Sequence, residues 1–167
     1  MKKLVVFYSL TGKTEIVAKT IAKELKADHC RVEEIKKRNR FLAYITGGYA
    51  AIRDRCSQIK PIELNVHDYD LILLGSPIWA SRPVPAINAF INNTDFKNKE
   101  VIAFFTMGGT EYKKAANNIT VKIEKSSGKV IDSFGVRAKR NSDEIVKETK
   151  KMIKSHLKHL SQYIVRE

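Results

Sequence analysis

A hydroxyl-rich stretch near the N-terminus carries residue types that bind phosphate groups. It consists of Ser9, Leu10, Thr11, Gly12, Lys13 and Thr14. Residues 4–8 before it form a continuous apolar run, typical of a buried strand, and apolar residues at helical spacing follow it. A turn between a strand and a helix leaves backbone amides unpaired at the positive end of the helix dipole. The three hydroxyls and these amides together predict a phosphate site, and Gly12 lets the backbone approach the ligand.

Two other interpretations of this stretch compete with a simple phosphate site. A single hydroxyl would more simply cap the helix, but three hydroxyls and a glycine within six residues favour a ligand. Gly12-Lys13-Thr14 also matches the end of the nucleotide-triphosphate motif G-x-x-x-x-G-K-[ST]. The first glycine of that motif would fall at Phe7, and the strand over 71–74 has no terminal Asp for magnesium. We therefore disfavour the triphosphate loop.

Two more predicted strands end in loops of unusual composition. The run 71–74 is the strongest buried-strand signal in the chain, and the glycine- and proline-containing loop 75–85 after it holds the only tryptophan, Trp79. A further strand over 101–106 leads into the polar glycine loop 106–110. In a parallel α/β sheet, ligands bind beyond the carboxyl ends of the strands, where such loops meet. The three loops are therefore expected to form one site.

The rest of the sequence predicts the strands and helices that would position that site. We expect short strands at 30–35 and 130–136, and helices at 85–91, 111–125 and, with Asn141 and Glu144 as a capping pair, at the C-terminus. The inward stripe of the last helix would be Val146, Thr149, Ile153, Leu157 and Leu160. Alternating strands and helices predict a doubly wound α/β fold, a parallel sheet with helices on both faces, in one domain over 1–167.

The segment 41–55 is the least regular part of the pattern. Aromatic and aliphatic residues there have helical spacing, but Gly47 and Gly48 interrupt them. Each glycine costs a helix about 1 kcal/mol relative to alanine, so a break or a moving loop is expected. Core packing is the favoured role of its aromatic residues, ahead of a lid or a partner surface.

Composition and charge limit the class of protein and the kind of partner that this chain can have. The 43% hydrophobic and 29% charged residues are typical of a soluble globular protein, and no window has the apolar length of a membrane span. The first apolar run is too short for a signal peptide, so a cytoplasmic location is expected. Cys30 and Cys56 have no metal-ligand spacing and are expected to be reduced thiols. The 31 basic and 18 acidic residues give a net charge of +13, which suits an anionic partner.

The three loops together resemble the flavodoxin family, over essentially the whole chain. The stretch 9–14 is similar to the family's loop for the phosphate of flavin mononucleotide (FMN). Residues 70–80 are similar to its second loop, where backbone and an aromatic residue meet the isoalloxazine ring, and 106–110 would be the third. The resemblance implies a three-layer sandwich with a five-stranded parallel sheet in the order 2-1-3-4-5. Beyond the first stretch it implies cofactor contacts at Ser76, Pro77, Ile78, Trp79, Ala80, Thr106, Met107, Gly108 and Gly109.

The chain departs from the family pattern in three respects. The third loop has no clear second aromatic residue to sandwich the flavin, although Tyr112 is close in sequence. Lys13 adds a charge to a loop that often holds phosphate without one. Flavodoxins that shuttle electrons are typically acidic, whereas this chain is strongly basic.

The resemblance implies an FMN protein that carries electrons between redox partners, with no catalytic side chain and no metal. The alternative is an FMN-dependent reductase that takes hydride from NAD(P)H and reduces a quinone or a similar small acceptor. The expected partner is an acidic redox protein or a small anionic acceptor. A nucleic-acid binder is disfavoured because the basic last helix has no interleaved aromatic residues. A receiver domain is excluded because it needs an acidic cluster after strand one.

Overall fold

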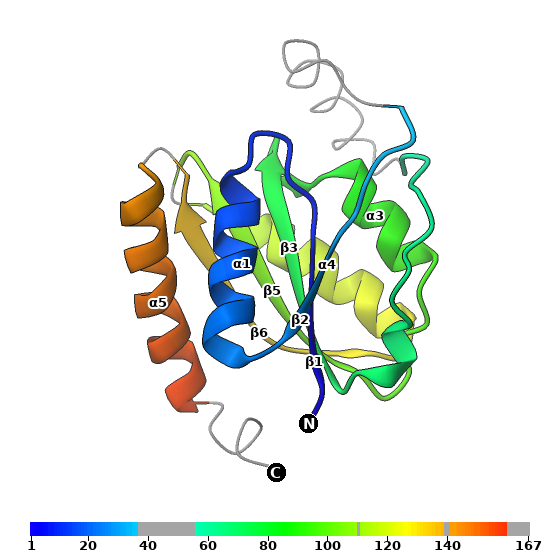
Figure 1. The fold of residues 1–167 in the computed structure, drawn as a ribbon. Coiled ribbons are helices and arrows are strands. Elements are labelled where there is room, and N and C mark those ends of the chain that lie inside the picture. Colours follow the sequence, from blue (N-terminus) through cyan, green and yellow to red (C-terminus); the bar gives the residue numbers. More distant parts are fainter. Residues whose placement is uncertain (37–55, 110, 139–140, 160–167) are drawn as a thin grey trace.

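The chain folds as a parallel β-sheet with helices packed on both faces (Figure 1). The computed structural model describes residues 1–36, 56–109, 111–138 and 141–159, with the backbone alone for 157–159. The strands are β1 (Lys3–Phe7), β2 (Asp28–Arg31), β3 (Leu71–Trp79), β4 (Arg82–Pro83), β5 (Glu100–Met107) and β6 (Lys129–Arg137). The helices are α1 (Lys13–Leu25), α3 (Pro85–Asn92), α4 (Lys113–Lys125), α5 (Ser142–His159) and the short 3₁₀ helix η1 (Val66–Asp68).

The parallel strands lie in the order β2-β1-β3-β5-β6. This confirms the predicted order of five parallel strands, and the short β4 is an additional strand that pairs antiparallel with β3. β1 is central, as expected from its apolar sequence: it pairs with β2 on one side and β3 on the other. The order places the ends of β1, β3 and β5 side by side at one edge of the sheet.

Alternate residues of β1, β3 and β5 belong to two separate cores. Leu4 and Val6 of β1 belong to a core with α3 and α4, while Val5 and Phe7 belong to the core with α1 and α5. Figure 1 shows α1 and α5 in front of the sheet and α4 behind it. A strand buried on both faces must be apolar throughout, which explains why β1, β3 and β5 were recognisable from sequence.

Several boundaries differ from those predicted. β2 ends at Arg31 rather than at 35, because its partner β1 ends at Phe7, which pairs with Arg31. α4 begins at Lys113, and Tyr112 before it stacks on Phe105 at 6.0 Å between ring centroids. At α5 the amide of Glu144 donates to Oδ1 of Asn141 at 2.9 Å, which confirms the capping pair.

The buried stripe of α5 is shifted by one residue at its start. Ile145 is buried and Val146 is partly exposed, whereas Thr149 and Ile153 are buried as predicted. The side chain of Leu157, Leu160 and the segment 41–55 lie outside the described residues.

The prediction that the third strand ends at Gly75 is wrong. β3 continues to Trp79, turns at Ala80 and Ser81, and pairs back through β4, with Ile78 opposite Pro83. Ala80 and Ser81 have φ of 48° and 62°, the pair of positive values that a two-residue type I′ hairpin turn requires. The proline and glycine residues suggested a loop, but the segment is a β-hairpin. The second predicted ligand loop is therefore a hairpin arm held by strand pairing.

Gly75 is required by the packing of the sheet. A Cβ atom at this position would lie 2.2 Å from Cζ of Phe104, which is fully buried and stacks on Phe134. We expect Gly75→Ala to lower the free energy of unfolding by about 1–3 kcal/mol, the usual cost of overpacking. Urea unfolding measures this loss. Gly109→Ala is the control, because nothing lies within 4 Å of its added Cβ; equal losses in the two variants would contradict the packing argument.

Candidate functional site

The three predicted loops meet at the carboxyl edge of the sheet. The amide of Tyr8 donates to the carbonyl of Gly75 at 3.1 Å, which joins the ends of β1 and β3. The hydroxyls of Thr14 and Thr106 lie 2.7 Å apart, which joins the first turn of α1 to the end of β5. Both threonines are buried, at 2% and 4% exposed. The convergence expected from the strand order is therefore present in the structure.

The N-terminus of α1 has the backbone of an anion site. Gly12 is the N-cap residue, with φ of 87°, and no side chain caps the helix. Ser9, which sequence alone offered as a cap, instead accepts a hydrogen bond from the amide of Gly12 at 3.1 Å. This bond holds the turn in shape and leaves the helix N-terminus without a side-chain acceptor. A phosphate group placed there would meet backbone amides at the positive end of the dipole.

Arg31 supports this loop from the neighbouring strand, and sequence reasoning missed it. One guanidinium nitrogen donates to the carbonyl of Ser9 at 2.6 Å, and another lies 3.1 Å from a carboxylate oxygen of Glu15. Arg31 is the last residue of β2, so it lies at the same edge of the sheet as the loop. No signal in the sequence pointed to this role, because the strand was predicted over 30–35 and Arg31 was not expected at its end.

The charges around the loop favour an anion. Glu15 pairs with Lys19 at 2.7 Å and with Arg31. The hydrogen bond from Lys19 is the main cause that lowers the pKa of the Glu15 carboxyl, and the charges of Lys19, Arg31 and His29 act in the same direction. Lys13 reaches across the edge and donates to the carbonyl of Ala138. Lys13 and Arg31 thus place two positive charges at this edge of the sheet, and Arg31 shares the Glu15 carboxylate with Lys19.

The hairpin arm has a buried base and an accessible tip. Ser76 is fully buried, and its hydroxyl accepts from the amide of Val84 at 3.2 Å, which ties β3 to the start of α3. Trp79 is only 6% exposed and meets Tyr8 edge to face at 6.1 Å. Pro77 and Ile78 are partly exposed and Ala80 is exposed. These contacts give Ser76 and Trp79 a packing role, and their contact with a cofactor stays a prediction.

The third loop continues β5. Met107 is buried and its carbonyl accepts from the amide of Ala138 at 2.7 Å, while Gly108 and Gly109 are exposed; Thr110 lies outside the described residues. Tyr112 is partly buried: its ring stacks on Phe105 and packs against the core, and a role as a second aromatic wall stays untested.

The predicted site residues thus divide into two groups. The buried group is Ser9, Thr14, Ser76, Trp79, Thr106 and Met107. The exposed or partly exposed group is Leu10, Thr11, Gly12, Lys13, Pro77, Ile78, Ala80, Gly108 and Gly109. The first group fixes the loops, and the second is the part of the site that a ligand can reach. None of the second group is a carboxylate, histidine or cysteine, so it offers amides, one hydroxyl, one ammonium and apolar surface.

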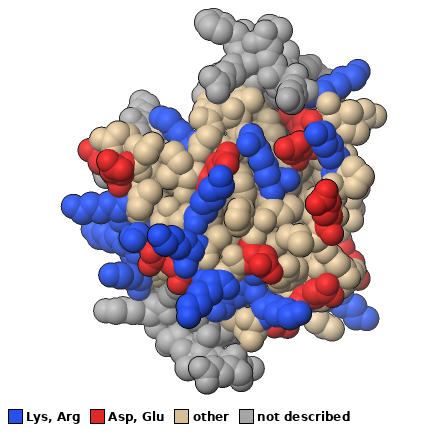
Figure 2. Space-filling model, in the orientation of Figure 1, with Lys and Arg blue, Asp and Glu red and all other residues tan. Residues whose placement is uncertain are grey.

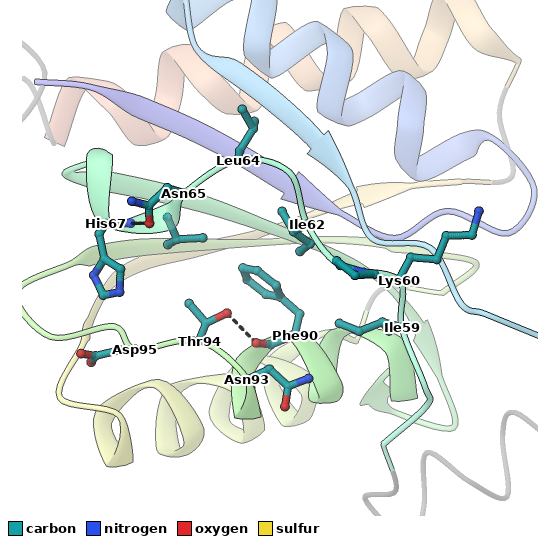
Figure 3. Close-up of a pocket in the computed structure, with 12 residues that line it drawn as sticks. Ile59, Lys60, Ile62, Leu64, Asn65, His67, Phe90, Asn93, Thr94 and Asp95 are labelled. Carbon is teal, nitrogen blue, oxygen red and sulfur yellow. Dashed lines mark hydrogen bonds between the residues drawn. The ribbon is translucent and has the colours of Figure 1, made fainter.

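A separate pocket of about 510 Å³ lies between residues 59–67 and the C-terminal end of α3 (Figure 3). Its walls combine apolar residues such as Ile62 and Phe90 with polar ones. The polar groups serve the local structure: Oδ1 of Asn65 caps η1, and Thr94 donates to the carbonyl of Phe90 at 2.7 Å. None of the predicted site residues lines this pocket, so it is not the site formed by the three loops.

The surface charge is unevenly distributed. Figure 2 shows basic side chains gathered over α5 and along the lower edge of the face that carries α1 and α5, with acidic side chains among them.

In the described part of the chain, no three metal-ligating side chains gather at one place. The helices of that part include none with the length and apolarity needed to span a membrane.

The hydroxyl pair of Thr14 and Thr106 gives a test of the site's frame. Thr14→Val should lower the free energy of unfolding by about 1–3 kcal/mol, because it leaves the Thr106 hydroxyl buried without its partner. The double variant Thr14→Val, Thr106→Val should recover much of that loss, since both polar groups are then removed. Thr11→Val is the control at an exposed position. Urea unfolding measures the free energy of unfolding of all three variants. If the double variant loses as much of it as two independent sites would together, the two hydroxyls are not coupled.

Comparisons with known proteins agree with this geometry. The model of a flavodoxin family matches residues 2–148. The structure is similar to a flavoprotein from Lactobacillus acidophilus solved in complex with FMN, with a TM-score of 0.70, 24% identity, and coverage of 89% of this chain and 98% of that one. It is also similar to oxidised flavodoxin 2 from Bacillus cereus, with a TM-score of 0.59, 17% identity, and coverage of 91% and 94%.

A search of curated proteins found no match. At such low sequence identities the similarity to solved structures shows the fold alone, whereas the match to the family model, which covers most of the chain, shows the family. With the sheet order and the three converging loops, these findings show that the chain belongs to the flavodoxin family.

Proposed function

We propose that this protein binds FMN at the three loops and carries electrons between redox partners. The observation that carries the proposal is the N-terminus of α1, which has no side-chain cap and lies beside Lys13, Lys19 and Arg31. Such a terminus suits a single terminal phosphate group. The sequence contains no G-x-G-x-x-G pattern for a pyrophosphate, which favours FMN over FAD.

The accessible residues fit the remainder of the cofactor. Pro77, Ile78 and Ala80 on the hairpin and Gly108 and Gly109 opposite offer apolar surface and exposed backbone. An isoalloxazine ring needs both, because it is a flat aromatic system with hydrogen-bonding edges. The similar protein from Lactobacillus acidophilus was solved with FMN, which supports the same cofactor for this chain.

A carrier is favoured over the reductase because none of the accessible predicted site residues is a carboxylate, histidine or cysteine. When bound, the flavin supplies the redox chemistry, and the protein contributes binding, orientation and electrostatics. The chain's part is to hold the phosphate on α1 and to keep the ring between two loops. The basic surface favours an acidic redox protein or a small anionic acceptor. The two free cysteines agree with a cytoplasmic location.

Cofactor identity can be tested by titration. We expect the apoprotein to bind FMN and not FAD, with quenching of the fluorescence of Trp79, the only tryptophan. Thr11→Val should weaken FMN binding by about 1–3 kcal/mol, because an exposed hydroxyl that can donate to a charged phosphate is removed. Thr11→Ser is the matched control and should bind FMN like the parent chain. Preferential FAD binding, or equal FMN affinity in all three proteins, would show that the loop assignment is wrong.

Steady-state turnover separates a carrier from a reductase. We expect the FMN-loaded protein to show negligible oxidation of NADH or NADPH in the presence of a quinone, because none of the accessible predicted site residues is a carboxylate, histidine or cysteine that could exchange a proton with the quinone. The measurement is the loss of nicotinamide absorbance, with free FMN at the same concentration as the control. Rapid turnover above that control would replace the carrier with the reductase.

A further inference from the structure

A basic groove lies between the β3–β4 hairpin and α4, and it shares Ala80 with the second predicted loop. It has a volume of about 580 Å³ and is lined by Ala80 to Arg82 on the hairpin and by residues of α4 between Lys114 and Lys125. Its cationic residues are Arg82, Lys114, Lys122 and Lys125. No acidic residue is among its described lining residues. We refer to it as the hairpin–α4 groove.

The cations of this groove are held in different ways. Nζ of Lys122 donates to Oδ1 of Asn88 at 2.7 Å, so this side chain is anchored to α3. Lys114 and Lys125 are exposed, and neither forms an ion pair with a described residue. By contrast, Lys150 on α5 pairs with Glu24 at 3.0 Å. Lys114 and Lys125 therefore carry positive charge that no acidic residue in the described part of the chain pairs with.

An apolar side chain lies among these charges. Val121 lines the groove and is 52% exposed, and among the described residues only Ile35 is another large hydrophobic side chain so exposed. Protein interfaces combine an apolar centre with a polar, charged rim. Val121 with Lys114 and Lys125 has this composition. A small anion would use the lysines but gain nothing from Val121, so the combination favours a protein ligand.

We infer that the hairpin–α4 groove is the docking surface for an acidic protein that exchanges electrons with the bound cofactor. The inference rests on the proposed function, because Ala80 belongs both to the groove and to the predicted cofactor contacts. A protein seated in the groove would lie against the same hairpin that carries Pro77 and Ile78. The net charge of +13 would speed its approach, and the groove would select its orientation.

The test uses two redox proteins of opposite charge as probes: the acidic cytochrome b5 and the basic cytochrome c. Their binding to the full chain is measured by titration calorimetry at low and at physiological salt. We expect cytochrome b5 to bind and cytochrome c not to bind, with the affinity falling as salt rises. The double variant Lys114→Glu, Lys125→Glu should weaken cytochrome b5 binding about tenfold or more, because like charges then face each other.

A matched pair on another helix controls for net charge. Lys147→Glu, Lys154→Glu on α5 changes the charge by the same amount at exposed positions and should weaken binding only about twofold, through long-range attraction. Val121→Ala leaves the charge unchanged and favours the helix, yet should weaken binding about fivefold by removing methyl groups that the docked partner would bury. Urea unfolding checks that each variant is folded.

Three outcomes would overturn the inference. They are absence of cytochrome b5 binding, equal losses in the α4 and α5 pairs, and an unchanged affinity in Val121→Ala. If inorganic phosphate instead binds saturably and only the α4 pair abolishes it, the groove holds a small anion and not a protein. FMN titration of the same variants distinguishes the two proposals. If FMN binds with unchanged affinity but cytochrome b5 does not bind, only the docking surface is wrong. If the parent chain does not bind FMN, the cofactor assignment is wrong.

Discussion

The hydrogen bond between the hydroxyls of Thr14 and Thr106 is the contact on which the site depends. It joins the first turn of α1 to the end of β5 across a distance of 92 residues in the sequence, and it is buried. Because a buried hydroxyl without a partner is costly, the pair fixes where the helix begins relative to the third loop. Arg31 holds the same turn from β2 through the carbonyl of Ser9. The helix N-terminus is thus positioned from both sides, and its amides are left for a ligand.

The hairpin likewise has buried residues that hold it in place and accessible residues that a ligand can reach. Ser76 is fully buried and bonded to the amide of Val84, and Trp79 packs edge to face on Tyr8. These contacts hold the arm so that Pro77, Ile78 and Ala80 remain accessible at its tip. In the proposed function the hairpin would hold one side of the flavin, and the proposed docking surface lies on the same hairpin.

The sequence was sufficient for the fold because its strongest signals are the buried strands. Residues such as Leu71 and Val101 occur in apolar runs that only a sheet covered on both faces explains. β4 was not predictable, because pairing of Ile78 with Pro83 depends on positive φ at Ala80 and Ser81, which neither residue type signals. The accessible loops were found from sequence, but the buried roles of Thr14 and Ser76 were not. A hydroxyl near a phosphate loop has the same sequence signature whether it meets the ligand or the core.

The central claim is that the phosphate of FMN sits at the N-terminus of α1 between the three loops. An amide ¹H–¹⁵N spectrum of the apoprotein during FMN titration tests it most directly. The account predicts the largest shifts at the amides of residues 10–14, with further shifts at 78–80 and 107–109. Shifts confined to the pocket at residues 59–67, or none at Gly12, Lys13 and Thr14, would contradict it.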